Sequence, residues 1–281
     1  MDSVQLKSKA RCLLELHKGP RILLLANAWD AASARIVEQL GFPAVATTSA
    51  GIANALGYPD GEQIPREAML EAVRRITQAV SVPVTADMEA GYGGSPEEAA
   101  RTAQLVLESG AVGMNIEDSN HGGKEPLVPV SLLVEKVRAI RSAMEAAGIP
   151  LVINARTDVF LNQVGEPEER LALAISRANA YREAGADCLF IPGVAGRETI
   201  TALVQGIRGP INILAGPSAP PVGDLERLGV RRVSLGSGPM RAAMGAFRRV
   251  AQELLAGGTY EALTQASITY DEMNRMLKAK A

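Results

Sequence analysis

Aromatic side chains are scarce in this sequence, where they make up 4% of the 281 residues. Because 47% of the residues are nevertheless hydrophobic, aliphatic side chains must fill a substantial core. The chain has no run of about 18 apolar residues, the length that a membrane-spanning helix requires. Its first 20 residues are polar and lack the apolar stretch of a signal peptide. We therefore expect no association with a membrane.

Cysteine and surplus positive charge are scarce as well. The two cysteines, Cys12 and Cys188, lie far apart and outside any CxxC pair, so we expect two reduced thiols in a cytoplasmic protein. The net charge is −2 at pH 7 and the isoelectric point is near 5.9. This balance offers no basic face for nucleic acid, which is therefore excluded as an expected partner.

Short aliphatic runs recur along the chain, and each one ends in small or polar residues. Their length and their β-branched content are typical of strands that are covered on both faces, as in a parallel sheet. There are eight such runs, at residues 21–27, 43–51, 82–89, 111–118, 149–158, 186–193, 210–216 and 231–238.

Helical patterns lie between these runs. Residues 95–110 begin with a serine cap followed by proline and acidic residues and end at a glycine, and residues 131–148 and 166–185 follow the same scheme. Eight strand–helix units predict a (β/α)8 TIM barrel. A doubly wound open sheet is the alternative, but no GxGxxG follows the first run. We expect one domain over residues 1–281, with residues 258–281 forming one or two extra helices.

The unusual polar residues gather where the predicted strands end. Asp87 and Glu89 lie at the end of the third run, Glu117 and Asp118 end the fourth, and Arg156 lies near the end of the fifth. In a barrel of this kind the carboxyl ends of the strands form one rim, which carries the chemistry. Carboxylates this close repel one another, so we expect a cation among them. Oxygen ligands without a His or Cys cluster favour Mg²⁺ or Mn²⁺ over zinc.

Four segments in this order resemble the isocitrate lyase / phosphoenolpyruvate mutase superfamily. They read NAWDAASARIVEQLGFPAVATTSAGIANALGYPDG, PVTADMEAGYG, GMNIEDS and INARTDVF. The resemblance implies a Mg²⁺-dependent barrel that acts on α-keto or α-hydroxy carboxylates through an enolate. It also implies a homotetramer, a dimer of dimers, in which paired subunits exchange the last barrel helix.

The resemblance assigns metal and substrate roles by position. Asp87 matches a direct metal ligand, and Glu89 and Glu117 match residues that hold the ion mostly through water. For the substrate carboxylate, the matching residues are Thr48, Ser49, Ala50, Asp60 and Arg156. Two structural alternatives stay open. Thr48 and Ser49 would be helix caps, and Arg156 would be an ion-pair partner of Asp158 or Glu117.

The chain departs from the superfamily in the loop after the fourth run. Lyases of the superfamily carry a proton-donating cysteine there, whereas residues 119–129 read SNHGGKEPLVP. His121 and Lys124 are the titratable replacements, and we take His121 as the candidate acid/base. Tyr92 is a candidate catalytic contact or a packing residue, and Ser218 is a candidate substrate contact. His17 is predicted on the surface of the first helix.

Three functions follow from these residues. The first is a Mg²⁺-dependent lyase, hydrolase or decarboxylase of a small keto or hydroxy (di)carboxylate, similar to oxaloacetate decarboxylases and methylisocitrate lyases but without the cysteine loop. The second is a phosphonate enzyme, such as a phosphoenolpyruvate mutase or a phosphonopyruvate hydrolase. The third is a barrel that binds keto acids without turning them over.

Overall fold

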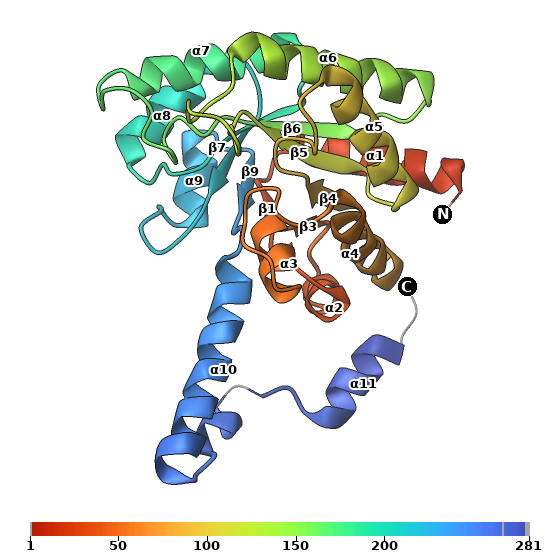
Figure 1. Ribbon diagram of the computed structural model, residues 1–281, viewed down its shortest axis with the longest axis vertical. Coiled ribbons are helices and arrows are strands. Elements are labelled where there is room, and N and C mark those ends of the chain that lie inside the picture. The colour runs from red at the N-terminus through yellow and green to blue at the C-terminus, as the bar shows by residue number, and fades with distance from the viewer. Residues whose placement is uncertain (1, 266, 279–281) are drawn as a thin grey trace.

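Parallel strands form a nearly closed barrel in the computed structural model, which describes residues 2–265 and 267–278 (Figure 1). The sheet order is β1-β9-β8-β7-β6-β5-β4-β3-β2, and all pairs are parallel. The strands are β1 (Leu23–Leu25), β2 (Asn27–Ala28), β3 (Val45–Thr47), β4 (Val84–Asp87), β5 (Gly113–Glu117), β6 (Val152–Arg156), β7 (Cys188–Ile191), β8 (Ile211–Leu214) and β9 (Arg232–Ser234). Strands β1 and β2 are two parts of one barrel strand that is interrupted at Ala26. The barrel therefore has eight strand positions, and the predicted (β/α)8 TIM barrel is confirmed.

Helices surround this barrel and follow its strands in alternation. They are α1 (Ser3–Leu16), α2 (Ala31–Gln39), α3 (Ser49–Ala55), α4 (Arg66–Ala79), α5 (Pro96–Glu108), α6 (Val130–Ala146), α7 (Arg170–Glu183), α8 (Arg197–Gly206), α9 (Val222–Leu228), α10 (Gly238–Gly257) and α11 (Tyr270–Lys278), with a 3₁₀ turn, η1 (Glu261–Thr264). No helix in the described ranges is both long and apolar enough to cross a bilayer.

Local signals explain where several helices begin. The Ser95 side chain accepts a hydrogen bond from the Glu98 backbone N–H, and the Glu98 carboxylate accepts one from the Ser95 backbone N–H, so α5 starts with a capping box and Pro96 in its first turn. In contrast, α7 begins at Arg170 instead of the predicted residue 166. Its N-cap, Glu169, makes no side-chain capping bond, so nothing local fixes an earlier start.

Helix α1 closes the amino end of the barrel. Leu13 is fully buried, and a Cβ added to Gly113 inside the barrel would lie 2.8 Å from its Cδ2 atom. His17, at the end of the same helix, is only 2% exposed. Its predicted surface position is therefore wrong: the end of α1 directs His17 toward the barrel interior, where its Nε2 lies 3.4 Å from Nη1 of Arg232.

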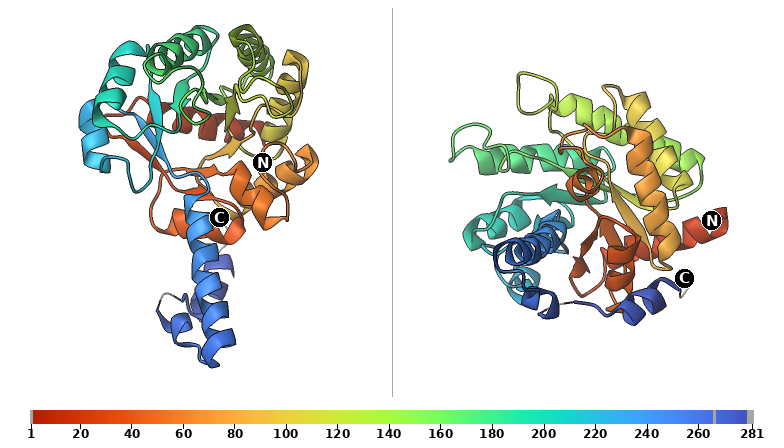
Figure 2. Two further views of the ribbon diagram at one scale, coloured as in Figure 1. Left: turned by 60° about the vertical axis from the view of Figure 1, so that its left-hand side comes forward. Right: turned by 60° about the horizontal axis from the view of Figure 1, so that its bottom comes forward.

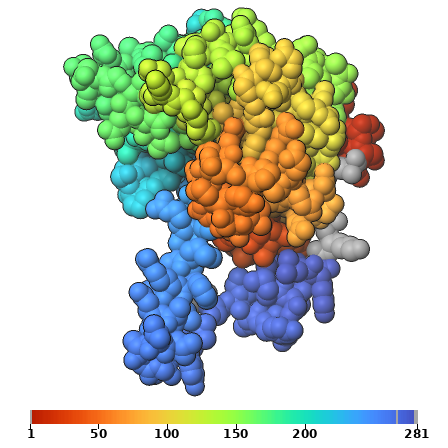
Figure 3. Space-filling view, in the orientation of Figure 1, coloured from red at the N-terminus to blue at the C-terminus, as the bar shows by residue number. Residues whose placement is uncertain are grey.

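Helix α10 leaves the barrel and projects from it, as the views in Figures 1 and 2 agree. Met240 is its only residue that is buried. The chain then turns through η1, and α11 comes back to the barrel, where the Arg35 side chain of α2 donates a hydrogen bond to the Met276 carbonyl at 3.0 Å. Figure 3 shows the far part of α10 and α11 as two separate masses beside the barrel. The described residues after Gly258 form η1 and α11, and residues 266 and 279–281 of the expected extension lie outside the described residues.

Candidate active site

A cavity of about 350 Å³ opens at the carboxyl ends of the strands. It is lined by Ser49, Asp60, Gly61, Glu89, Glu117, Ser119, Asn120, His121, Pro126, Arg156, Asp158, Leu161 and Asn162. Six of the residues singled out from the sequence therefore share one cavity: Ser49, Asp60, Glu89, Glu117, His121 and Arg156. Their convergence follows from the barrel, which brings the ends of β3, β4, β5 and β6 to one rim.

Asp87 lies just beneath this cavity, at the end of β4, and is 8% exposed. Its Oδ2 atom accepts hydrogen bonds from the Ser49 backbone N–H at 3.0 Å and from the Ser49 hydroxyl at 2.8 Å. Its Oδ1 atom accepts one from the Asn115 side chain at 3.1 Å. The carboxylate is thus held on both oxygens, as a fixed ligand requires.

Glu89 follows Asp87 in a strained turn. Glu62, Glu89 and Tyr92 have φ angles of 55°, 50° and 54°, in the left-handed region that non-glycine residues rarely adopt. They support one another: the Glu62 N–H donates to Glu89 Oε2 at 2.6 Å, and the Tyr92 N–H donates to Glu62 Oε1 at 2.7 Å. Strain of this kind tends to gather at functional sites.

Two of the carboxyl groups bind protons more tightly than usual. Burial, reinforced by the charge of Asp87, raises the pKa of Glu89 to about 8. Burial also raises the pKa of Glu117, although the guanidinium of Arg156 and the hydrogen bond from His121 oppose the shift. The hydrogen bond with Glu117 in turn raises the pKa of His121, whose Nε2 lies 3.0 Å from Glu117 Oε1.

These oxygens could hold a hard divalent ion. Among the described residues, no group of three or more His, Cys, Asp or Glu side chains is arranged so that it could hold a metal ion by itself. Glu89 Oε1, however, is buried and has no hydrogen-bond partner in the described part of the chain, so it is left to a water or an ion. One direct ligand, Asp87, with Glu89 and Glu117 acting through water, fits Mg²⁺, which keeps much of its hydration shell.

Arg156 provides the positive charge of the cavity. Its Nε and Nη2 atoms contact the two oxygens of Asp158 at 2.6 and 2.9 Å, and its Nη1 lies 2.8 Å from Glu117 Oε2. The guanidinium also lies 5.7 Å from the centre of the Phe190 ring. Both structural ion pairs that the sequence left open are therefore present, and they hold the guanidinium at the cavity wall.

The remaining sequence candidates lie outside the cavity lining. Thr48 is buried and caps α3, with its hydroxyl accepting from the Gly51 N–H at 3.3 Å, and Ala50 is half-buried in the first turn of that helix. The Tyr92 hydroxyl is buried without a partner in the described ranges. Ser218 is exposed and lines a different cavity of about 740 Å³, over the ends of β7 to β9.

Some residues of the site were missed in the sequence. Asn120, Leu161 and Asn162 line the cavity from the loops that follow β5 and β6, together with Ser119, which the sequence offered only as a polar group of the loop after the fourth run. Asn115 contacts Asp87, and its position two residues before Glu117 was a usable signal, because alternate residues of a strand share a face. The loop residues offered no comparable signal, since their positions depend on tertiary packing.

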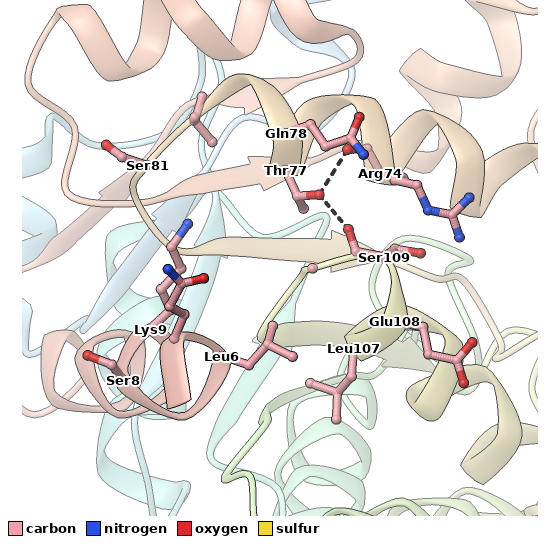
Figure 4. Close-up of a pocket in the computed structure, with 13 residues that line it drawn as sticks. Leu6, Ser8, Lys9, Arg74, Thr77, Gln78, Ser81, Leu107, Glu108 and Ser109 are labelled. Atoms are coloured by element: carbon pink, nitrogen blue, oxygen red, sulfur yellow. Dashed lines mark hydrogen bonds between the residues drawn. The ribbon is translucent and has the colours of Figure 1, made fainter. Parts of the chain in front are cut away.

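A larger cavity of about 850 Å³ lies at the opposite end of the barrel. It is lined by residues of α1, of the end of α4 and of the end of α5 (Figure 4). Because α4 and α5 lead into β4 and β5, their ends lie at the amino ends of the strands. The Thr77 hydroxyl in it is satisfied by the carbonyls of Arg74 and Ser109, as the dashed lines show. Glu108 is the single carboxylate in its lining, so it has no counterpart to the cluster at the other rim.

Comparison with known proteins agrees with this fold. The family profile for phosphoenolpyruvate phosphomutase matches residues 13–255. The chain belongs to the phosphoenolpyruvate phosphomutase family. The predicted membership of the wider isocitrate lyase / phosphoenolpyruvate mutase superfamily, a superfamily of enzymes, is thereby confirmed.

Individual relatives differ in their named reactions. An oxaloacetate decarboxylase of Rhodopseudomonas palustris is 32% identical over 97% of this chain and 93% of its own. A 2-methylisocitrate lyase of Halalkalibacterium halodurans is 30% identical over 88% of this chain and 82% of its own. The structure of an oxaloacetate acetylhydrolase with its product oxalate has a TM-score of 0.84 and 25% identity, covering 96% of this chain and 94% of that one.

Proposed function

We propose that this protein is a Mg²⁺-dependent lyase, hydrolase or decarboxylase that breaks a carbon–carbon bond in a small α-keto or α-hydroxy (di)carboxylate. The observation that carries the proposal is the single cavity in which Arg156 faces Glu89 and Glu117 above Asp87. Relatives named for oxaloacetate and methylisocitrate support the substrate class. Mn²⁺ could replace Mg²⁺ among these oxygen ligands.

Each residue of the cavity has a different role in the proposed reaction. Arg156 binds the substrate carboxylate, and its attachment to Asp158 fixes the direction from which it does so. Asp87, with Glu89 and Glu117, would hold the ion, which would supply Lewis acidity to the cavity. The hydroxyl and backbone N–H of Ser49 both donate to Asp87 Oδ2 and so hold this carboxylate at that side of the cavity.

His121 is the proposed proton donor. Its side chain is 24% exposed at the cavity, with Nε2 between Glu117 Oε1 at 3.0 Å and Glu89 Oε2 at 3.8 Å. These carboxylates favour the protonated imidazole, which can deliver its Nε2 proton to the enolate carbon after the bond breaks. His121 thus occupies the role that a cysteine has in the superfamily's lyases.

Phosphonate chemistry is less well supported by the same cavity. Its lining contains four carboxylates, Asp60, Glu89, Glu117 and Asp158, but only Arg156 and His121 as basic groups. A dianionic phosphonate requires several cationic or N–H donors around its oxygens. A keto acid needs only one such donor for its carboxylate.

Product analysis tests the proposal. Wild-type protein and Asp87→Asn are incubated with Mg²⁺ and, separately, with oxaloacetate, 2-methylisocitrate and phosphonopyruvate, and products are followed by NMR. We expect the wild type to convert oxaloacetate faster than Asp87→Asn, whose rate should fall to that of Mg²⁺ alone while its circular dichroism is unchanged. If oxaloacetate binds without product, the protein is a keto-acid-binding barrel; conversion of phosphonopyruvate alone would favour the phosphonate alternative.

A further inference from the structure

A layer of buried polar side chains lies inside the barrel, below the candidate metal ligands. In the strand register Asp87 of β4 is opposite Asn115 of β5, and Asn115 is opposite Asn154 of β6. Asn115 is 7% exposed and Asn154 is fully buried. Three polar side chains therefore lie side by side on the inner wall, and only the first of them has a role in the proposed chemistry.

Hydrogen bonds join this layer to Asp87 in one direction. The Asn115 Nδ2 atom donates to Asp87 Oδ1 at 3.1 Å. The Asn115 Oδ1 atom accepts from Asn154 Nδ2 at 2.8 Å and from Arg232 Nη2 at 3.4 Å. Since β9 and β5 are not neighbours in the sheet, the contact with Arg232 crosses the interior of the barrel.

Arg232 determines how the side-chain amide of Asn115 is oriented. Its side chain is 1% exposed, and it forms no salt bridge with a carboxylate within the described ranges. A guanidinium can only donate hydrogen bonds, so the atom of Asn115 that faces it must be the carbonyl oxygen. The amide nitrogen of Asn115 must then point toward Asp87, where it meets an acceptor.

This arrangement leaves one hydrogen-bond acceptor direction of the Asp87 carboxylate open. Asp87 Oδ2 already accepts two hydrogen bonds from Ser49, whereas Oδ1 accepts one from Asn115. A carboxylate oxygen has two acceptor directions, so Oδ1 keeps one for a further partner. Groups that orient a ligand in this way typically change metal affinity about 10–100-fold when they are removed.

We propose that Asn115, oriented by Asn154 and Arg232, is the positioning residue that aims Oδ1 of Asp87 at the metal. The proposal rests on the proposed function, because it assumes that Asp87 binds the ion. Asn115 acts through Asp87 and does not itself touch the substrate cavity. The barrel wall beneath the site is thereby part of the metal-binding machinery.

The test measures Mn²⁺ affinity by calorimetry, independently of turnover. Asn115→Leu keeps the branching at Cγ but removes the donor, and we expect its Mn²⁺ dissociation constant to rise about tenfold or more. Asn154→Ala should also weaken Mn²⁺ binding, although Asn154 does not contact Asp87. Because both act through one hydrogen-bonded path, Asn154→Ala should have no added effect in the Asn115→Leu background.

A matched control is a buried asparagine elsewhere in the barrel interior. Asn212 pairs with Ser234 at 3.1 Å, so Asn212→Ala should leave Mn²⁺ binding unchanged while it perturbs the core to a similar degree. Thermal unfolding by circular dichroism accompanies each variant. Wild-type affinity in folded Asn115→Leu, or equal losses from Asn154→Ala in both backgrounds, would overturn the proposal. If Asn115→Leu does not fold, Asn154→Ala against Asn212→Ala decides. Absence of Mn²⁺ binding by the wild type would instead refute the metal site itself.

Discussion

Arg156 shows how a single side chain can have structural and chemical roles at once. Its guanidinium uses one edge for Asp158 and a further nitrogen for Glu117, and its side chain is 16% exposed to the cavity. A planar group with five donors can bind a substrate carboxylate while it keeps such partners, whereas a lysine ammonium cannot keep the same geometry.

Replacement of Arg156 by lysine should therefore weaken keto-acid binding. With Mg²⁺ present, we expect Arg156→Lys to bind oxalate less tightly by about 1–3 kcal/mol, the scale of a charged hydrogen bond. Calorimetry measures this change. Arg177→Lys is the control, because Arg177 also forms a buried ion pair, with Asp118 at 3.0 Å, but does not line the cavity. Unchanged oxalate affinity in Arg156→Lys would remove Arg156 from the substrate site.

His17 makes stability depend on pH. Burial, together with the nearby charge of Arg232, lowers its pKa from 6.5 to about 4. The unfolded chain then binds the proton more tightly than the folded one, so this contribution is complete above pH 6.5 and is lost as the pH falls toward 4. From the linkage relation we expect a loss of about 2 kcal/mol in the free energy of unfolding by pH 5.

Urea unfolding of the wild type and of His17→Gln, at pH 7.5 and at pH 5.0, measures this contribution. The neutral amide cannot take up the proton, so the difference between the two pH values should be smaller in His17→Gln by the same amount. Equal pH dependence in both proteins would show that His17 is not the group responsible.

At the scale of elements, the loop after β5 decides which proton donor is available. Ser119 and Leu127 form an isolated antiparallel bridge, and the Asn120 N–H donates to the Pro126 carbonyl at 3.1 Å. The loop is therefore a short closed hairpin, with His121 near its start and beside Glu117. We propose that the His121 imidazole of this loop serves where the resemblance leads us to expect a cysteine thiol.

This loop predicts a preference among substrates. Cleavage of methylisocitrate leaves an enolate that must be protonated from one face, whereas oxaloacetate needs less proton delivery. We therefore expect methylisocitrate cleavage to be slow relative to oxaloacetate turnover.

His121→Ala should lower the rate on oxaloacetate by about 10²–10⁴, the usual value of a positioned acid. Lys124→Ala, an exposed neighbour in the same loop, is the control. Methylisocitrate cleavage at about 10 s⁻¹, an ordinary enzyme rate, would contradict the expectation.

Elements with local signals could be predicted from the sequence, and those fixed by tertiary contacts could not. The capping residues identified α5, and the aliphatic runs identified the eight strands of the barrel. The second run was predicted to extend to residue 51, but β3 ends at Thr47 because Thr48 caps α3. The burial of His17 and the separation of Ser218 from the cavity depend on how distant segments pack. Asp87, Glu117 and Arg156 were predictable because strand ends converge in a barrel.

At the scale of the whole molecule, α10 is the element that the single chain leaves without a partner surface. Met244, Phe247 and Leu254 are 48%, 67% and 58% exposed, and Leu255 is 90% exposed. Burial of an apolar side chain of this size is worth about 1.5–3 kcal/mol. A projecting helix with several such residues is suited to pack on a second copy of the chain, as the superfamily's exchange of the last barrel helix implies.

We therefore expect the protein to be a homo-oligomer, a dimer of dimers held in part by exchanged α10 helices. Light scattering after size exclusion should give a mass above that of the 29.6 kDa chain. Phe247→Glu combined with Leu254→Glu should lower this mass, because a charge buried at the contact costs more than the contact returns. Val4→Glu is the control, since Val4 is 76% exposed but lies on α1. A monomeric wild type, or an unchanged mass in the double variant, would show that α10 projects for another reason.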